Sequence, residues 1–471
     1  MTPEEKLASL GLTLPQVPTP LANYVPYRWA GNLLYLSGQG PKNPDGTLCI
    51  GRLGRDTSIE EGYAHARLTG LGLLAAAKAA IGELSRIEAV IKLLGMVNAE
   101  PDFGAHPRVA DMSIDTLKAE IARRYGTPAH VIDLDIVERN IARLQSMCDA
   151  ASIANRPHIK THKSPVLAAM QIAAWAKGIT CQKLGEAEVM AEGGQDDILI
   201  SYNILGEEKL GRLGRLAGRV KMTVSADNPV VVGGLPRAAE IAGRPLDVLV
   251  ECDTGRARAG VVTPEEAVAL AQQIAAQPGL AFAGFLIYPP ETAIPETQAF
   301  LDAAMAGVRS AGLDPRVVSS GGTPNLPHLG QIKGVTEHRA GTCIFNDRMM
   351  MAAGVASLED CALSVYATVV SRAAPERGIL DAGSKTLTSD TGGLDGFGFI
   401  IEHPEARLAR FAEEHGFLDL SACDQPPKVG EVVRVVPNHV CVAVNMVDRY
   451  ITVRGGEIIG ELPIAARGRL S

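Results

Sequence analysis

Hydrophobic and polar positions alternate regularly through the middle of the chain. Between residues 156 and 343, apolar runs of strand length are separated by Ala-, Leu- and Glu-rich stretches with helical periodicity. The eight predicted strands are 156–162, 178–183, 196–203, 220–226, 246–253, 280–288, 315–322 and 335–343. Repeated β–α units indicate a parallel sheet. Eight such units favour a closed (β/α)8 TIM barrel of the α/β class over an open, doubly wound sheet.

The pattern changes on both sides of the predicted barrel. After residue 361, short apolar runs separated by Gly, Pro and Asn predict an all-β domain. Its predicted strands are 362–372, 377–384, 396–403, 430–439, 440–448, 449–455 and 456–464. Near the N-terminus, strand-like runs at 31–40 and 90–103 flank an Ala-rich helix at 60–84. We therefore expect four segments, which are a partial α+β module (1–111), a linker (112–128), the barrel (129–355) and a C-terminal β domain (356–471).

Composition excludes several classes of protein. A net charge of −8 and a pI near 5.8 disfavour nucleic acid or an anionic membrane as the partner. No apolar run reaches the roughly 18 residues that a membrane-spanning helix needs. Eight scattered cysteines without a CxxC pair predict mostly buried thiols in a reducing compartment. These features indicate a cytoplasmic protein.

Two lysines lie near the end of the first predicted strand, in the segment RPHIKTHKSP (156–165). In a barrel, functional groups gather at the carboxyl ends of the strands. Lys160 is placed there to form a Schiff base with an aldehyde cofactor such as pyridoxal phosphate, and a surface lysine is the alternative. Lys163 competes for this role, but it falls past the strand end and is expected to face solvent or the cofactor phosphate.

Two glycine-bearing segments end the last two predicted strands. A phosphate needs backbone N–H groups and little steric bulk. In barrels, the loops after strands seven and eight frequently bind phosphate. The residues expected at this phosphate site are Ser320, Gly321, Gly322, Thr323, Gly341 and Thr342.

An arginine follows the fifth predicted strand in the segment ECDTGRARAG. Arg258 is a candidate for contact with the cofactor ring or with a substrate carboxylate, and a structural ion pair is the alternative. Arg256 is a weaker candidate because it comes two residues earlier in the turn.

The predicted β domain contains His439 and Cys441, two residues apart in VVPNHVCVAVN. In a strand, both side chains project from the same face. An imidazole and a thiolate can hold one divalent ion and leave positions open for substrate or water. A thiolate favours zinc, with manganese or magnesium as alternatives. A buried cysteine beside a hydrogen-bonded histidine is the interpretation without a metal.

Together these motifs resemble the metal-activated pyridoxal phosphate enzymes of the D-threonine aldolase and D-serine dehydratase type, whose fold is similar to that of alanine racemase. The resemblance covers about residues 113–471 and rests on RPHIKTHKSP, ECDTGRARAG, VSSGGTPN, EHRAGTC, DAGSKTLTSD, EEHG, PNHVCVAVN and PIAARG. It implies that Lys160 carries the cofactor and that the glycine loops hold its phosphate. It also implies that His439 and Cys441 bind the metal near the β-hydroxyl of the substrate. His158 and Tyr288 are expected beside the cofactor, in a homodimer.

The reaction implied by the resemblance is retro-aldol cleavage of a D-3-hydroxy amino acid to glycine and an aldehyde. The alternatives are dehydration of D-serine or D-3-hydroxyaspartate to a 2-oxo acid and ammonia, racemisation, and cofactor binding without catalysis. The chain departs from the family pattern at Cys343, where an aromatic residue is usual, and at Pro289, where a histidine often follows Tyr288. The base that acts on the β-hydroxyl therefore stays unassigned.

The first 110 or so residues resemble the RidA/YjgF family of enamine and imine deaminases, through ANYVPY, LYLSGQGP and the run from 60 to 103. That family continues through another helix and a strand carrying a catalytic arginine. This chain switches to the aldolase-like sequence first, so we expect a partial module. It is either a deaminase that hydrolyses an enamine released by a dehydratase or the remnant of a gene fusion.

Overall fold

The computed structural model describes residues 2–9, 12–17, 25–43, 46–88, 90, 95–100 and 112–471. The chain divides into two compact units, residues 1–117 and 118–471. In the described part of the chain, no helix has the length and apolar character needed to cross a membrane.

The first unit is built around the predicted Ala-rich helix, which is confirmed as α2 (Ile59–Ile81). The Ser58 hydroxyl accepts a hydrogen bond from the Glu61 N–H, and the Glu61 carboxylate accepts one from the Ser58 N–H. This capping box fixes the start of the helix. The other elements are α1 (Pro3–Ser9), β1 (Tyr27–Ala30), β2 (Leu33–Leu36) and η1 (Leu84–Arg86). Of the strand expected at 90–103, residues 91–94 and 101–103 lie outside the described residues, and Ala99 forms a single β-bridge with Leu53.

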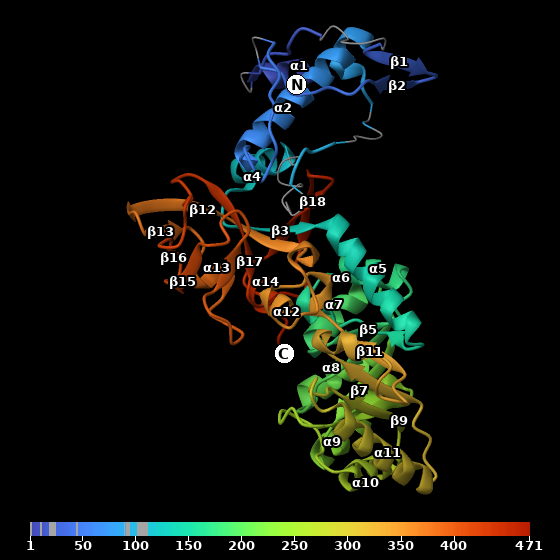
Figure 1. Cartoon of the computed structure of the whole chain (residues 1–471). Coiled ribbons are helices and arrows are strands. Elements are labelled where there is room, and N and C mark those ends of the chain that lie inside the picture. Colours follow the sequence, from blue (N-terminus) through green and yellow to red (C-terminus); the bar gives the residue numbers. More distant parts are fainter. Residues whose placement is uncertain are drawn as a thin grey trace. The chain divides into compact units, whose positions relative to one another are not determined.

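The second unit, which begins within α4 (Met112–Tyr125), contains the predicted barrel, and the eight-stranded parallel sheet is confirmed. Its strands, green to yellow in Figure 1 apart from the first, are β4 (Ala154–Asn155), β5 (Ile179–Cys181), β6 (Asp197–Ile200), β7 (Lys221–Ala226), β8 (Leu246–Cys252), β9 (Leu280–Ile287), β10 (Val317–Gly321) and β11 (Glu337–Arg339). They lie in the order β4-β11-β10-β9-β8-β7-β6-β5, and a bridge between His158 and Thr180 joins the two ends. The first strand predicted at 156–162 is wrong, because β4 ends at Asn155 and the predicted range contains the 3-10 turn η2 (Ile159–Thr161).

Helices cover the outside of the barrel. They are α5 (Leu134–Ala150), α6 (Pro165–Ala173), α7 (Leu184–Glu192), α8 (Glu207–Ala217), α9 (Pro229–Ala242), α10 (Pro264–Ala276) and α11 (Ile294–Ser310). The apolar faces of α6 to α11 and the outward side chains of the strands form one large buried core. The helix α5 packs into two other clusters, one of which it shares with the β domain. The last two strands are followed instead by short 3-10 helices, η3 (Thr323–His328) and η4 (Thr342–Ile344). The chain then passes through α12 (Arg348–Ala352) and η5 (Leu358–Asp360) into the next domain.

The C-terminal β domain is confirmed as a sheet in which β13 pairs with both β16 and β12, so that six strands close into a ring. Its elements are β12 (Leu363–Ala374), β13 (Arg377–Leu380), α13 (Ser384–Leu387), β14 (Gly398–Ile400), β15 (Arg407–Phe411), β16 (Gly416–Asp419), β17 (Val432–Pro437), α14 (Val440–Val444), β18 (Arg449–Arg454) and β19 (Glu457–Pro463). The strand β3 (Ala129–Asp133) also lies in this sheet, between β12 and β18, although we expected these residues in the barrel segment.

The strand predicted at 440–448 is wrong. β17 ends at Pro437, and the helix α14 begins directly after His439. Val440 and Val444 are buried four residues apart, which is the spacing of one helix face. A short apolar run of this kind fits a strand or a helix equally well.

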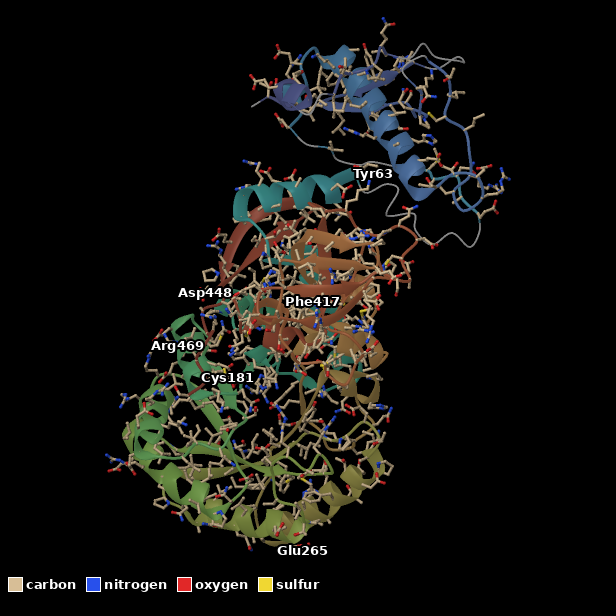
Figure 2. All side chains as sticks on the ribbon, turned by 90° about the vertical axis from the view of Figure 1, so that its left-hand side faces the viewer. Tyr63, Cys181, Glu265, Phe417, Asp448 and Arg469 are labelled. Atoms are coloured by element: carbon tan, nitrogen blue, oxygen red, sulfur yellow. The ribbon has the colours of Figure 1, made fainter. Side chains whose placement is uncertain are left out.

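The last residues of the chain lie against the barrel. The Ala466 N–H donates to the carbonyl of Lys163 (3.0 Å), and the Gly185 N–H donates to the carbonyl of Ser471 (2.9 Å). Figure 2 shows Arg469 on this side of the barrel, above Cys181, and its Cβ would lie 3.2 Å from a Cβ placed on Gly185. The β domain and the barrel are therefore joined next to the segment that carries the two candidate lysines.

Candidate active site

Lys160 lies on η2, just beyond the carboxyl end of β4. Its backbone N–H donates to Nδ1 of His158 (3.4 Å), and the hydroxyl of its neighbour Thr161 lies 3.1 Å from the sulfur of Cys441. Among the described residues, no carboxylate lies within ion-pair distance of this amine. Lys160 is therefore a cation at the barrel mouth that no acidic side chain holds.

Lys163 is placed differently, and the expectation that it faces solvent or a phosphate is wrong. Its Nζ lies 2.8 Å from Oε1 of Glu186, and the two side chains are only 5% and 2% exposed. A buried ion pair of this kind holds its lysine in one place. The structure therefore distinguishes the two lysines, since only Lys160 keeps its amine available.

His158 and His162 have different surroundings. The Nδ1 of His158 accepts a hydrogen bond from the Lys160 N–H (3.4 Å), and its Nε2 lies 3.2 Å from Oε1 of Gln182, so that Nε2 carries the proton. Burial, with Lys160 nearby, lowers the pKa of His158 well below its ordinary value. The ring of His162 bonds to Gln171 and to the Ser164 N–H, away from Lys160, and burial lowers its pKa to about 4. His158 is therefore a neutral ring beside the lysine, whereas His162 belongs to the core.

The glycine loops leave no room for side chains. A Cβ on Gly322 would lie 2.4 Å from the Tyr288 ring, and one on Gly341 would lie 2.8 Å from the carbonyl oxygen of His158. Gly321 is similarly close to the guanidinium of Arg339, at 3.1 Å. Gly322 and Gly341 directly precede η3 and η4, and neither glycine has a side chain that would cover the start of the turn. Backbone N–H groups at such a turn are suited to an anion.

Two threonines connect these loops to their surroundings. The Thr323 hydroxyl accepts a hydrogen bond from the Cys343 N–H (3.2 Å), which joins the loop after β10 to the loop after β11. The Thr342 hydroxyl lies 3.8 Å from the sulfur of Cys441 in the β domain. The predicted phosphate loops and the predicted metal pair therefore meet.

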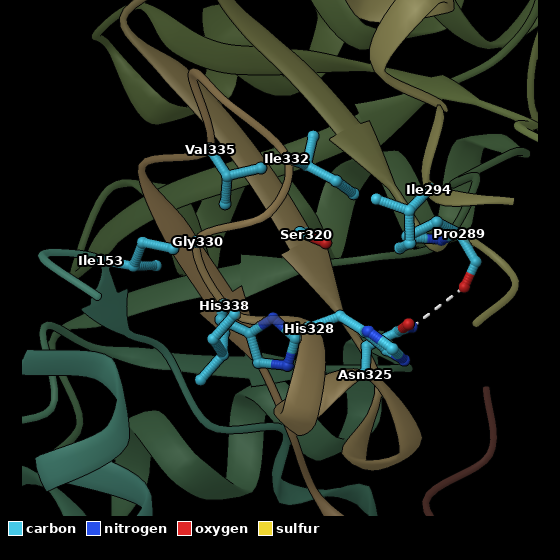
Figure 3. A pocket seen from close by; sticks show the side chains of 11 residues that line it. Ile153, Pro289, Ile294, Ser320, Asn325, His328, Gly330, Ile332, Val335 and His338 are labelled. Atoms are coloured by element: carbon cyan, nitrogen blue, oxygen red, sulfur yellow. Dashed lines mark hydrogen bonds between the residues drawn. The ribbon is translucent and has the colours of Figure 1, made fainter. Parts of the chain in front are cut away.

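Ser320 points elsewhere. Its neighbour Ser319 donates to a carboxylate oxygen of Glu337 (2.8 Å), and successive side chains of a strand face opposite ways. Ser320 instead lines a small pocket with apolar side chains such as Ile332 and Val335 (Figure 3). Its free volume of about 10 Å³ has room for about one water molecule. Only the backbone of Ser320 is therefore placed to contribute to the glycine loop.

Two arginines lie by Tyr288, which directly follows β9. Arg256 forms an ion pair with Glu291 (2.7 Å), and its guanidinium lies 4.3 Å from the centre of the Tyr288 ring. Arg258 lies 5.2 Å from the same ring and is exposed. Within the described ranges, no carboxylate lies within ion-pair distance of Arg258. Of the two arginines, Arg258 is therefore the one without a carboxylate partner in the described chain, and its contact with a ligand stays a prediction.

His439 and Cys441 meet at the start of α14. His439 is the residue before the helix and Cys441 lies in its first turn, so the helix start brings them together in place of the strand that we expected. The Nδ1 of His439 lies 2.6 Å from Oδ2 of Asp390, which leaves Nε2 for the sulfur of Cys441. The Thr161 hydroxyl, next to Lys160 in η2, lies 3.1 Å from that sulfur. The His439–Cys441 pair of the β domain therefore contacts η2, the turn of the barrel that carries Lys160.

The charges of this pair are coupled. The hydrogen bond to Cys441, assisted by Asp390, raises the pKa of His439 to about 9. Burial would raise the pKa of Cys441, but His439 and Lys160 hold it below its ordinary value. A thiolate and an imidazole are ligands that zinc prefers. No group of three or more His, Cys, Asp and Glu side chains suited to a metal occurs among the described residues, so substrate or water has to complete a metal shell here.

Sequence reasoning did not identify Asp390 and Gln182. Asp390 is 49 residues from His439 in the sequence, so no local spacing connects the two. Gln182 directly follows β5, and its position at the carboxyl end of a barrel strand is a signal that could have identified it.

Three family models match the sequence. The N-terminal domain of alanine racemase matches residues 132–349, a serine dehydratase domain matches 362–453, and the YjgF/chorismate mutase-like family matches 4–154. These matches cover the barrel, the β domain and the N-terminal module. They confirm the composite organisation predicted from the sequence.

Individual proteins resemble the chain over the barrel and the β domain. D-threonine aldolase from Arthrobacter sp is 36% identical over 359 residues, which cover 73% of this chain and 93% of that protein. The structure of D-threonine aldolase from Filomicrobium marinum has a TM-score of 0.68 and 32% identity, and the match covers 73% of this chain and 96% of that one. D-threo-3-hydroxyaspartate dehydratase from Delftia sp. HT23 has a TM-score of 0.66 and 31% identity, with 72% of this chain and 97% of that one covered.

Two variants of that dehydratase are also similar to this chain. One has alanine in place of a histidine, and the other has alanine in place of a cysteine two positions further on and is in the metal-free form. The two substituted positions have the spacing of His439 and Cys441. The chain therefore belongs to the family of alanine-racemase-like lyases that includes D-threonine aldolase and D-threo-3-hydroxyaspartate dehydratase.

Proposed function

We propose that this protein is a pyridoxal phosphate- and divalent-metal-dependent lyase that cleaves D-3-hydroxy amino acids to glycine and an aldehyde. The observation that carries the proposal is the contact between the Lys160 turn of the barrel and Cys441 of the β domain, where the hydroxyl of Thr161 lies 3.1 Å from the Cys441 sulfur. The lysine that would bind the cofactor and the His439–Cys441 pair that would bind the metal are therefore close enough to act on the same substrate molecule.

The residues around Lys160 fit pyridoxal phosphate. Lys160 offers an amine that no carboxylate of the described chain engages, and any side chain at Gly322 or Gly341 would collide with its neighbours, so that glycine leaves the start of each turn open to an anion. His158 is a neutral, buried ring next to the amine. The cofactor, when bound to Lys160, supplies an electron sink for bond cleavage at the α-carbon.

The donor set of the β domain fits a divalent ion. A thiolate and an imidazole nitrogen favour zinc, and Asp390 orients the imidazole as carboxylates commonly do in metal sites. The ion supplies a Lewis acid that makes a substrate hydroxyl easier to deprotonate. The Thr161 hydroxyl, at 3.1 Å, is placed to donate to the sulfur and so to stabilise its negative charge.

The remaining polar groups of the site orient the substrate. Arg258 is an exposed guanidinium at the barrel mouth without a carboxylate partner among the described residues, which suits an α-carboxylate. Arg256 is held by Glu291 and supports the Tyr288 ring between the two arginines. A small D-amino acid would thus be fixed by its carboxylate at one end and by its β-hydroxyl at the other.

A specific observation also favours dehydration as the second candidate. The His-x-Cys spacing of residues 439–441 is the spacing of the two positions substituted in the D-threo-3-hydroxyaspartate dehydratase variants. In this route the Lys160 amine would remove the α-proton and the hydroxyl would leave as water. The enamine product would then tautomerise to an imine, which water hydrolyses to a 2-oxo acid and ammonia. The same residues serve both reactions.

The products distinguish the two reactions. The purified holoenzyme is incubated separately with D-threonine and with D-threo-3-hydroxyaspartate, and glycine, 2-oxo acid and ammonia are quantified. We expect glycine and acetaldehyde from D-threonine in a 1:1 ratio, and no turnover by Lys160→Ala. A 2-oxo acid with matching ammonia and no glycine would establish the dehydratase, and no product from either substrate would contradict both proposals.

A further inference from the structure

A closed ring of contacts surrounds the segment that carries Lys160. The Nζ of Lys163 meets Glu186 Oε1 at 2.8 Å, and Glu186 Oε2 accepts a hydrogen bond from the Gln182 N–H at 2.8 Å. The Gln182 side-chain oxygen accepts from His158 Nε2 at 3.2 Å, and His158 Nδ1 accepts from the Lys160 N–H. The 3-10 turn η2 connects Lys160 back to Lys163. The ring of contacts therefore begins and ends in the segment from Lys160 to Lys163.

Two polar groups of this ring, the Glu186 carboxylate and the Gln182 amide, are each fixed by a second contact. The Glu186 carboxylate also accepts a hydrogen bond from the Lys183 N–H (3.2 Å) and is only 2% exposed. The Gln182 amide donates to the carbonyl of Ser201 (3.0 Å), which determines which of its ends faces His158. Hydrogen bonds in such a buried network reinforce one another.

The backbone of Lys163 turns its side chain into this ring. Its φ of +52° lies in the left-handed region, which non-glycine residues rarely adopt. Its N–H donates to the carbonyl of Ile159 (2.8 Å), and its own carbonyl accepts from Ala466 of the C-terminal segment (3.0 Å). The conformation is thus held from both sides, and the Lys163 side chain reaches α7.

We infer that Lys163, Glu186 and Gln182 are positioning residues that hold the Lys160 amine in reach of the cofactor aldehyde. By occupying the buried Glu186 carboxylate, Lys163 leaves Lys160 without an acidic partner, while Gln182 fixes the ring of His158 against the Lys160 backbone. None of the three is placed at the reacting atoms. The inference rests on the proposed role of Lys160 as the cofactor lysine.

The ion pair is tested by neutralising both of its members together. Lys163→Met with Glu186→Gln preserves volume and avoids an uncompensated buried charge. The matched control is Arg212→Met with Glu188→Gln, because this pair also anchors α7 through two hydrogen bonds of 2.8 and 2.7 Å. For each holoenzyme we would measure the visible absorbance of the bound cofactor, the cofactor mass on Lys160 after borohydride reduction, kcat and KM.

We expect the Lys163/Glu186 double variant to carry less reducible cofactor on Lys160 and to lose about 10- to 100-fold in kcat, with a smaller change in KM, as for a misplaced catalytic group. The Arg212/Glu188 control should match the wild type. Gln182→Met, which removes no charge, should change the cofactor absorbance and lower kcat in the same direction. If the double variant does not fold, the Gln182→Met variant alone tests the positioning role.

Wild-type attachment and kcat in both Gln182→Met and a folded Lys163/Glu186 double variant would overturn the inference. So would wild-type values in Gln182→Met when the double variant does not fold. A failure of the proposed function looks different, because the wild-type protein itself would then carry no reducible cofactor on Lys160.

Discussion

Replacing Asp390 with asparagine tests how the β domain prepares its metal site. The carboxylate lies 2.6 Å from Nδ1 of His439 and therefore fixes the imidazole so that Nε2 faces Cys441. Asp390→Asn keeps the size of the side chain but removes its charge. We expect the metal affinity to fall, with little effect on folding, because the Asp390 side chain is 40% exposed.

The size of this effect follows from the geometry. A hydrogen bond to a charged group contributes about 1.5–3 kcal/mol, and the loss of such an orienting partner typically costs about 10- to 100-fold in metal affinity. The side chains of His439 and Asp390 are 30% and 40% exposed, so solvent screens the pair and the effect should lie at the lower end. We therefore expect about a tenfold loss, which corresponds to about 1.4 kcal/mol.

The assay is competition for Zn²⁺ between the apo-protein and a chromogenic chelator at pH 7.5, alongside turnover as a function of free metal. Asp395→Asn is the matched control, because Asp395 lies in the same segment and pairs with Arg407 rather than with His439. The control should bind zinc as the wild type does. An unchanged dissociation constant for Asp390→Asn would refute the idea that Asp390 orients the imidazole.

The other predictions concern the glycine loop and stability. Gly341→Ala should abolish cofactor binding because its Cβ would lie 2.8 Å from a backbone oxygen, whereas Gly233→Ala, with open space around it, should bind cofactor normally in the same absorbance titration. Arg156→Met should lower the free energy of unfolding by about 3 kcal/mol in urea because Glu337 and Asp197 lose the buried arginine that they share, and each keeps only an exposed lysine as its cation partner, while Arg316→Met, at an exposed ion pair, should cost less than about 1 kcal/mol. Burial lowers the pKa of His338 to about 4. Between pH 6.5 and 4 this histidine is therefore protonated in the unfolded chain but neutral in the folded chain, which destabilises the fold. The urea midpoint should accordingly fall as the pH decreases from 6.5 to 4, and a midpoint that rises over this range would contradict the assignment.

The sequence allowed the barrel and the place of Lys160 at its mouth to be predicted because both depend on local patterns. The β–α alternation is visible in the apolar periodicity, and the carboxyl ends of the strands are where a barrel places its functional groups. Lys160, the glycine loops and Arg258 followed from that rule. The first strand ended early because residues 156–162 enter a 3-10 turn, which periodicity alone does not reveal.

Tertiary contacts explain what could not be predicted. The partner of Lys163 is a glutamate 23 residues away on another helix, so the lysine that looked solvent-exposed is buried. The His439–Cys441 pair forms at a helix start, since a five-residue apolar run satisfies helix and strand patterns alike. Asp390 reaches His439 across 49 residues of sequence, and only the fold brings them together.

The most direct test of the central claim is the position of the cofactor in the wild-type protein. The holoenzyme is reduced with borohydride, digested and analysed by mass spectrometry, with Lys160→Ala treated in parallel. We predict the added mass of reduced pyridoxal phosphate on the peptide containing Lys160 and none in the variant. Label on Lys163 or on any other lysine, or a wild-type protein without label, would contradict the mechanism proposed here.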